Sequence, residues 1–229
     1  MKILFNLVFL VSLICFSNVT FAKHYSSKQI ERFVDKTPRD AENNIPKLVS
    51  FLTKPFDNDY DKAKAISFWI ASRISYDEYL YNNGSATRLR DTYFGQKPKE
   101  LLKSRVGICG DFAELFKEMC RRAGIRAYNI RGYAYPSGRR PTLSQKRSQG
   151  HVWNYFIFNN KKVYVDTTFM ADGRTGVKGS GSSMNRDRAL RKIKNKNKYK
   201  SRTSNFDDFY FDFNYKSEIT YKGYKREER

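Results

Sequence analysis

The chain has 229 residues, of which 44 are Lys or Arg and 23 are Asp or Glu, so its formal charge at pH 7 is +21. Hydrophobic residues make up 40% of the sequence, aromatic residues 16% and charged residues 29%. These proportions exclude both a multi-span membrane protein and a fully disordered chain. The length suits one domain of enzyme size, and three cysteines are too few for a disulfide-rich scaffold.

Residues 1–22 have the pattern of a secretory signal peptide. Lys2 is followed by an apolar run and then by small and polar residues up to Ala22, after which we expect cleavage. The uninterrupted apolar run is about half as long as a bilayer span requires, although an uncleaved anchor stays open as the alternative. Cleavage would leave 43 basic residues against 23 acidic ones, a charge of +20, on a secreted or periplasmic protein.

Hydrophobic periodicity places helices in the first half of the chain and strands in the second. We expect helices in residues 26–53 (two, separated at Pro38), 58–74, 98–103 and 109–123, and strands in residues 125–135, 151–158 and 162–168. Helices followed by antiparallel strands indicate an α+β fold.

The composition changes after Asp172. Residues 173–205 combine a Gly/Ser-rich stretch with a run of nine Lys and Arg residues against one Asp, which is typical of a flexible basic segment. Aromatic and polar residues then alternate over residues 206–215, as in a half-buried strand that could close the sheet. The predicted organisation is a signal peptide (1–22), an N-terminal helical extension (23–57), a core (58–172), the basic segment (173–205) and a C-terminal strand and tail (206–229).

Cleavage of the signal peptide removes Cys15 and leaves two cysteines in the mature chain. Cys109 and Cys120 lie on one predicted helix, which separates them by roughly 16 Å. A disulfide needs Cα atoms within about 7 Å. We therefore expect both thiols to be free.

Cys109 stands at the start of that helix, between Gly107-Ile108 and Gly110-Asp111. Unpaired N–H groups and the positive end of the helix dipole favour a thiolate there. The flanking glycines let the backbone approach closely, and the Cys109 N–H could face a developing oxyanion. The structural alternative is a small buried residue in a turn.

The mature chain has two histidines, and His24 lies close to the expected cleavage site, so His151 is the one available inside the fold. If Asn159 and Asn160 form a two-residue hairpin turn, Asp166 lies on the same face as His151, one diagonal step away. A thiol, an imidazole and a carboxylate are the groups of a Cys-His-Asp triad. The alternatives are a satisfied structural histidine and an aspartate that caps a turn.

Several motifs follow one another in an order that is known from other proteins. They are Ala65-Ile66, Trp69, Ile74-Ser75-Tyr76-Asp77, Gly107-Ile108-Cys109-Gly110-Asp111-Phe112-Ala113, Ala123-Gly124-Ile125, Gly132-Tyr133, His151-Val152-Trp153-Asn154 and Val165-Asp166-Thr167-Thr168. The set resembles the core of the transglutaminase-like superfamily, which includes transglutaminases, bacterial transglutaminase-like cysteine peptidases, kyphoscoliosis-type peptidases and peptide N-glycanases. The resemblance implies a papain-like fold, with N-terminal helices packed on an antiparallel sheet, and a triad of Cys109, His151 and Asp166.

This reading predicts an exported cysteine enzyme that acts on peptide or glutamine carboxamide bonds through a thioester. We favour hydrolysis, as in a peptidase or amidase, because a small exported domain needs extra architecture to exclude water. The alternatives are a protein-glutamine transglutaminase and a catalytically inactive basic module that binds anionic envelope polymers. No cofactor and no metal site are expected, since no ligand cluster occurs in the sequence.

The positive charge also bears on partners. Basic residues gather without acids in the loop of residues 131–150, and again, with a single Asp, in residues 186–202. Such a field steers polyanions, and export makes anionic envelope polymers or acidic proteins the expected partners beside a protein or peptide substrate, rather than nucleic acid. The alternative is a solvated surface, and the sequence predicts no oligomeric state.

Overall fold

A computed structural model describes residues 25–77, 95–133, 150–171, 175–177, 210–212 and 225–226. The predicted signal peptide and nearly all of the predicted basic segment lie outside these ranges. Within them, every helix is too short or too polar to span a lipid bilayer.

Three helices form the N-terminal layer: α1 (Ser27–Val34), α2 (Ile45–Thr53) and α3 (Asp59–Arg73). Asn44 and Asn58 cap α2 and α3, because each side-chain oxygen accepts a backbone N–H of the first turn. Helix α3 is buried along nearly its whole length, and α1 and α2 both pack on it. The helices expected in residues 26–53 and 58–74 are confirmed.

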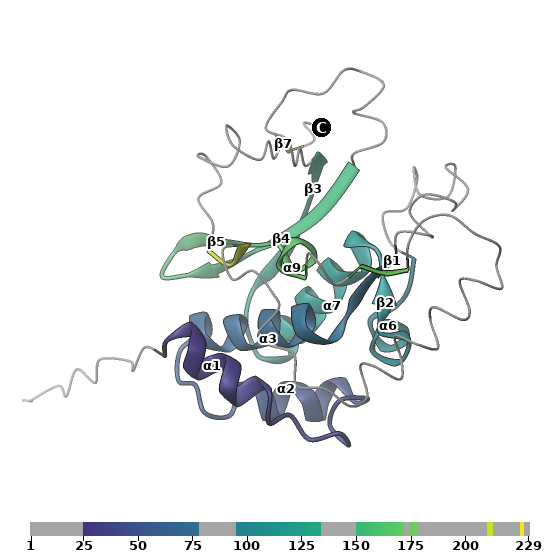
Figure 1. The fold of residues 1–229 in the computed structure, drawn as a ribbon. Coiled ribbons are helices and arrows are strands. Elements are labelled where there is room, and N and C mark those ends of the chain that lie inside the picture. Colours follow the sequence, from purple (N-terminus) through teal and green to yellow (C-terminus); the bar gives the residue numbers. More distant parts are fainter. Residues whose placement is uncertain are drawn as a thin grey trace, which may run out of the picture.

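Helix α7 (Cys109–Arg122) lies at the centre of the fold, after the short helix α6 (Pro98–Ser104). It contacts α2 and α3 on one side and strands on the other, and Figure 1 shows it between α3 and the strands. Its apolar residues Phe112, Leu115, Phe116 and Met119 are fully buried. The core therefore lies between the N-terminal helices and the sheet, with α7 passing through it.

The larger sheet is antiparallel, with strand order β5-β4-β3-β7. Its strands are β3 (Ala127–Tyr133), β4 (Gly150–Phe158), β5 (Lys161–Val165) and β7 (Lys225–Arg226). Asn159 and Asn160 form the two-residue turn between β4 and β5, with φ of 48° and 60°, and Phe158 pairs with Lys161. The predicted hairpin and its register are confirmed, and so is the α+β fold class.

A second, parallel sheet has the order β2-β1-β6, from β1 (Ser75–Asp77), β2 (Val106–Gly107) and β6 (Thr175–Val177). Tyr76 pairs with Gly107 on one side and Thr175 on the other. The sequence did not predict this sheet. It fixes the chain two residues before Cys109.

The strand predicted over residues 162–168 was too long. Strand β5 ends at Val165, and Asp166 caps a short helix, α9 (Thr167–Met170). The carboxylate of Asp166 accepts the N–H groups of the first turn of α9, which ends the sheet pairing. Of the strand predicted in residues 206–215, Tyr210–Asp212 are described, and Phe211 forms an antiparallel bridge with Val165 beside β5.

Candidate active site

The first turn of α7 is held by the carboxylate of Asp111. Its Oδ2 accepts the Ile108 N–H at 3.0 Å, and its Oδ1 accepts the N–H groups of Gly95 and Gln96 at 2.7 and 2.8 Å. Burial raises the pKa of the Asp111 carboxyl, and the N–H donors oppose that rise. This buried carboxylate therefore fixes the turn that carries Cys109, whose own side chain is buried.

His151 and Asp166 meet at the other side of the site. His151 lies at the start of β4 and Asp166 directly follows β5, and His151 Nε2 is 2.6 Å from Asp166 Oδ2. The other carboxylate oxygen, Oδ1, accepts the N–H groups of Thr168 and Phe169 at 3.1 and 3.0 Å. Asp166 thus contacts the histidine and caps α9 at the same time, so the expected turn cap is present and the role in a triad stays a prediction.

Aromatic rings hold the imidazole in place. The ring of Phe169 stacks on His151 with centroids 4.6 Å apart and planes inclined by 14°. Trp153 lies near parallel to the imidazole at 5.9 Å. With both contacts and the Asp166 hydrogen bond, the orientation of the ring is fixed before any substrate arrives.

The electrostatics of His151 depend on two polar neighbours, Asp166 and Cys109. Burial by itself would lower the pKa of His151, but the charge and hydrogen bond of Asp166 and a side-chain hydrogen bond with Cys109 outweigh it and raise the pKa to about 10. Because Nε2 faces Asp166, Nδ1 is the ring nitrogen left for the thiol. Cys109 also packs with Ala113, Val152 and Tyr76. The structure therefore brings Cys109, His151 and Asp166 together.

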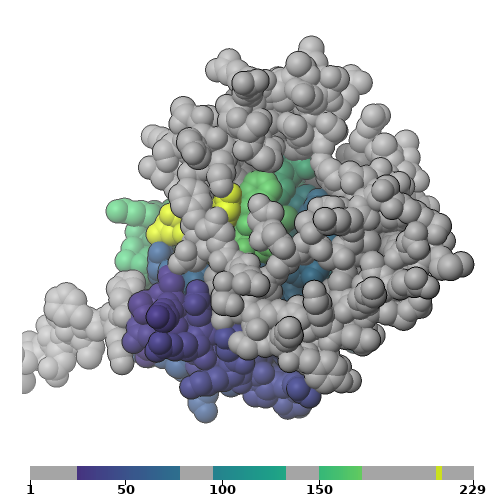
Figure 2. Space-filling view, in the orientation of Figure 1, coloured from purple at the N-terminus to yellow at the C-terminus, as the bar shows by residue number. Residues whose placement is uncertain are grey.

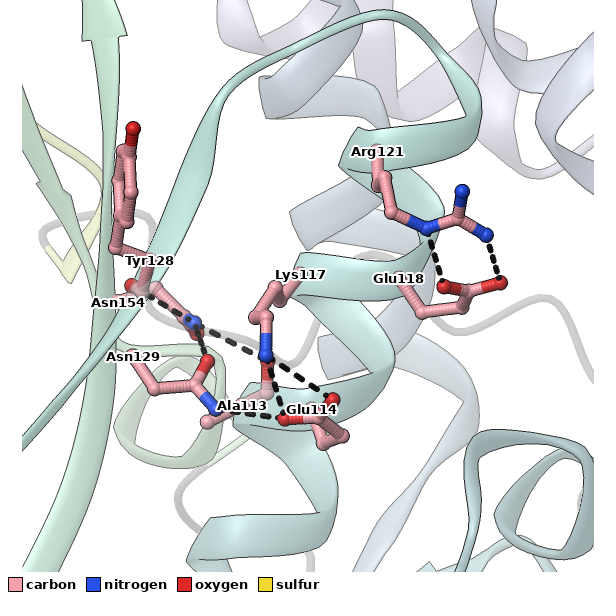
Figure 3. A network of polar contacts seen from close by, with 8 residues as sticks. All are labelled: Ala113, Glu114, Lys117, Glu118, Arg121, Tyr128, Asn129 and Asn154. Atoms are coloured by element: carbon pink, nitrogen blue, oxygen red, sulfur yellow. Dashed lines mark hydrogen bonds and ion pairs between the residues drawn. The ribbon is translucent and has the colours of Figure 1, made fainter.

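A polar brace ties the helix of Cys109 to the strand of His151 (Figure 3). Asn154 Nδ2, fully buried on β4, donates to the Ala113 carbonyl of α7 at 3.1 Å and to Asn129 Oδ1 of β3 at 2.9 Å. Asn129 in turn donates to Glu114 Oε2 at 2.7 Å. Ala113 lies one turn after Cys109 and Asn154 three residues after His151, so the brace sets the spacing between the two.

Cys120, the second thiol of the described chain, is fully buried in the core on the same helix, and both cysteines are free as predicted. Burial raises the pKa of Cys120 well above its ordinary value, so this group stays a thiol. Sequence reasoning did not identify Asp111, Asn154 or Phe169 as supporting residues. The acid three residues into the helix was a readable signal for Asp111, whereas the other two depend on long-range packing.

Several known proteins resemble this chain. Residues 46–167 match the family model of the transglutaminase-like superfamily. Kyphoscoliosis peptidase from Homo sapiens is 29% identical over 129 residues, and its counterpart from Mus musculus is 28% identical over 127 residues. Each match covers 56% of this chain, which spans only 18% of the length of those relatives.

Two solved structures are also similar. One is a Cytophaga hutchinsonii protein provisionally described as a cysteine protease, with a TM-score of 0.41 and 24% identity over 61% of this chain and 42% of that one. The other is the periplasmic domain of TgpA from Pseudomonas aeruginosa, with a TM-score of 0.41 and 15% identity over 62% of this chain and 49% of that one.

Proposed function

Because the chain belongs to the transglutaminase-like superfamily, whose members are generally cysteine-dependent enzymes, we propose that it hydrolyses peptide or carboxamide bonds. Cys109 is the nucleophile, His151 the proton donor and acceptor, and Asp166 the group that orients His151. The observation that carries this proposal is the 2.6 Å contact of His151 with Asp166, while the same imidazole hydrogen-bonds Cys109. These are the roles that a thiol-imidazole-carboxylate set performs in acyl transfer.

The first half of the reaction forms a thioester. The Cys109 thiolate attacks the carbonyl carbon, a C–S bond forms, and the carbonyl oxygen becomes an oxyanion. The Cys109 N–H at the first turn of α7 is the donor that we assign to it. When the C–N bond breaks, the imidazolium of His151 gives its Nδ1 proton to the departing amine, and its raised pKa keeps that proton available at neutral pH.

The second half returns the enzyme to its starting state. Neutral His151 takes a proton from water, the hydroxide attacks the thioester carbonyl, and the C–S bond breaks to give a carboxylic acid and the thiolate. The acid then loses its proton to solvent, and the thiolate and the imidazolium of His151 are restored. A lysine amine in place of water would give a transglutaminase with the same three residues. Hydrolysis is proposed because amine transfer needs a further site that excludes water.

The test measures the reactivity of Cys109 without assuming a substrate. Iodoacetamide alkylation is followed across pH, and peptide mass mapping separates Cys109 from Cys120. We expect fast labelling of Cys109 below pH 7, slowed by His151→Ala and unchanged by Cys120→Ser as the matched control. Slow labelling that rises only near pH 8.5, the ordinary thiol range, would overturn the triad and favour the inactive basic module.

Substrate screens then separate the two enzymatic readings. Wild-type protein is incubated with unfolded protein substrates, with and without a labelled primary amine, and Cys109→Ala is the control. Fragments without amine incorporation support a peptidase, and released ammonia alone supports an amidase. Incorporation that Cys109→Ala abolishes would contradict hydrolysis as the main reaction.

Export and the choice of partner belong to the same proposal. The charge of +20 after cleavage at Ala22 would draw the enzyme towards anionic envelope polymers or acidic proteins outside the cytoplasm. Binding of the mature protein to an anionic polymer is expected to weaken steeply with salt. A shallow dependence would mean that the charge only solvates the surface.

A further inference from the structure

The segment Tyr210–Asp212 runs along the outer side of β5, next to Asp166. The Asp166 N–H donates to the Tyr210 carbonyl at 3.0 Å, and the Asp212 N–H donates to the Tyr164 carbonyl at 2.8 Å. Between these bonds Phe211 forms an antiparallel bridge with Val165. In Figure 2 the yellow atoms of this segment lie against the green atoms of residues 150–171. The segment therefore holds the backbone at and just before Asp166.

The same segment also reaches His151 through one intermediate ring. Tyr210 contacts Phe169 with ring centroids 5.5 Å apart, and Phe169 stacks on His151. Tyr210 and Phe211 are both buried. A shift of this segment would thus be felt by the backbone of Asp166 and by the packing of the imidazole.

A hydrogen bond from α3 fastens the segment. The Tyr60 hydroxyl donates to Asp212 Oδ2 at 3.0 Å, and the Tyr60 ring meets Phe211 edge-on at 5.2 Å. Lys64 Nζ lies over the Phe211 ring at 5.4 Å. Burial and the charge of Asp212 raise the pKa of Tyr60 well above its usual range, so the hydroxyl stays a donor. Asp212 has φ of 60°, a conformation that aspartate tolerates better than most residues.

We propose that Tyr210–Asp212 is a positioning segment of the active site, fastened by the Tyr60–Asp212 hydrogen bond, which holds Asp166 against His151. Tyr60 and Asp212 touch no reacting atom and act through Asp166 and Phe169. The segment lies outside residues 46–167, the part that matches the family model, so the carboxylate of the core is held by a later part of the chain. This inference rests on the proposed function.

The test reads His151 directly. The chain has two histidines, so an NMR titration of the imidazole signals, assigned with His24→Gln, follows His151 without a substrate. Tyr60→Phe removes only the fastening hydroxyl, and Asp212→Asn removes the charge. Tyr25→Phe is the matched control, because it removes a tyrosine hydroxyl that donates to the Pro55 carbonyl at 3.2 Å in the N-terminal helices.

We expect Tyr60→Phe and Asp212→Asn each to lower the pKa of His151 by about one unit, a tenfold change in its proton affinity. Alkylation of Cys109 at pH 6 should slow by about three- to tenfold. The double variant should be no worse than Tyr60→Phe alone, since both substitutions act on the same hydrogen bond, which Tyr60→Phe abolishes and Asp212→Asn weakens. Tyr25→Phe should leave the titration and the alkylation rate at wild-type values.

The proposal is overturned if both variants titrate and alkylate like the wild type and only lower the melting temperature. Tyr25→Phe calibrates how much melting temperature the loss of one tyrosine hydroxyl costs. If Tyr60→Phe does not fold, Asp212→Asn provides the test, because Asp212 is exposed and its substitution leaves the core intact. The proposed function fails separately, when the wild type shows the coupled titration but cleaves no peptide or amide. If Cys109 is unreactive in the wild type, the titration of His151 still tests the segment through Asp166.

Discussion

Gly107 lies where β2 meets the first turn of α7 and has no room for a side chain. A Cβ atom there would be 2.6 Å from Leu101 Cδ1 and 2.8 Å from Asp111 Oδ2, whereas carbon atoms ordinarily pack at about 3.5–4.0 Å. Leu101 is fully buried and Asp111 Oδ2 already accepts the Ile108 N–H, so neither group can yield freely. Overpacking costs about 1–3 kcal/mol and a weakened cap about 1 kcal/mol. Gly107→Ala should therefore destabilise the protein by about 2–4 kcal/mol.

Gly124, at the other end of α7, is the matched control. Its φ is 79° and nothing lies within 4 Å of an added Cβ, so Gly124→Ala meets only the left-handed strain of about 1–2 kcal/mol. For a chain of this size each kcal/mol lowers the melting temperature by about 2–4 °C. We expect a loss of about 5–15 °C for Gly107→Ala and a smaller loss for Gly124→Ala.

Thermal unfolding and the iodoacetamide rate of Cys109 at 25 °C are measured for both variants. Gly107→Ala should slow alkylation several-fold, because the clash displaces the turn that carries the thiol, while Gly124→Ala should keep the wild-type rate. If Gly107→Ala melts no lower than Gly124→Ala and alkylates normally, Asp111 does not position the nucleophile and the reasoning is wrong.

Three further predictions concern the site. Asp166→Asn removes the charge that raises the pKa of His151, so alkylation of Cys109 at pH 6 should fall more than tenfold; an unchanged rate would contradict this role. Asn154→Leu leaves the acceptors of the brace unpaired and should lower the free energy of unfolding by about 2–4 kcal/mol. In a denaturant titration the midpoint should fall while the slope, the m-value, stays constant. The pKa of His151 is raised on folding, so protonation of His151 stabilises the folded protein. This contribution is complete at pH values below about 6.5, the pKa of histidine in the unfolded chain, and is lost as the pH rises through about 10. The wild type should therefore lose more melting temperature between pH 7 and 10 than His151→Gln does, and parallel curves would refute the linkage.

The hairpin that joins His151 and Asp166 could be predicted because its information is local. Asn159 and Asn160 adopt positive φ more readily than most residues, and a two-residue turn fixes which residues face each other on β4 and β5. That parity alone places the imidazole and the carboxylate on one face. The helix of Cys109 was equally readable, from its apolar period and its glycine at the C-terminal end.

The supporting contacts could not be predicted, because they join segments far apart in the chain. Strand β1 has three residues and pairs with β2 and β6 without any periodic signal. The strand predicted to continue through Thr168 ended at Val165 because Asp166 used its second oxygen to cap α9. The roles of Tyr60 and Asn154 depend on partners in other elements, which no local pattern specifies.

The two oxygens of Asp166 explain why the site is set before substrate binds. With Oδ1 bound by two N–H groups of α9, the carboxylate cannot rotate without breaking them, so Oδ2 stays directed at His151 Nε2. In the proposed reaction Nδ1 then faces Cys109 in every turnover, whether water or an amine resolves the thioester. These three residues therefore do not choose the acceptor. That choice depends on the groups around the thioester carbonyl, and the ratio of hydrolysis to amine transfer should change with substitutions there while the alkylation profile of Cys109 stays constant.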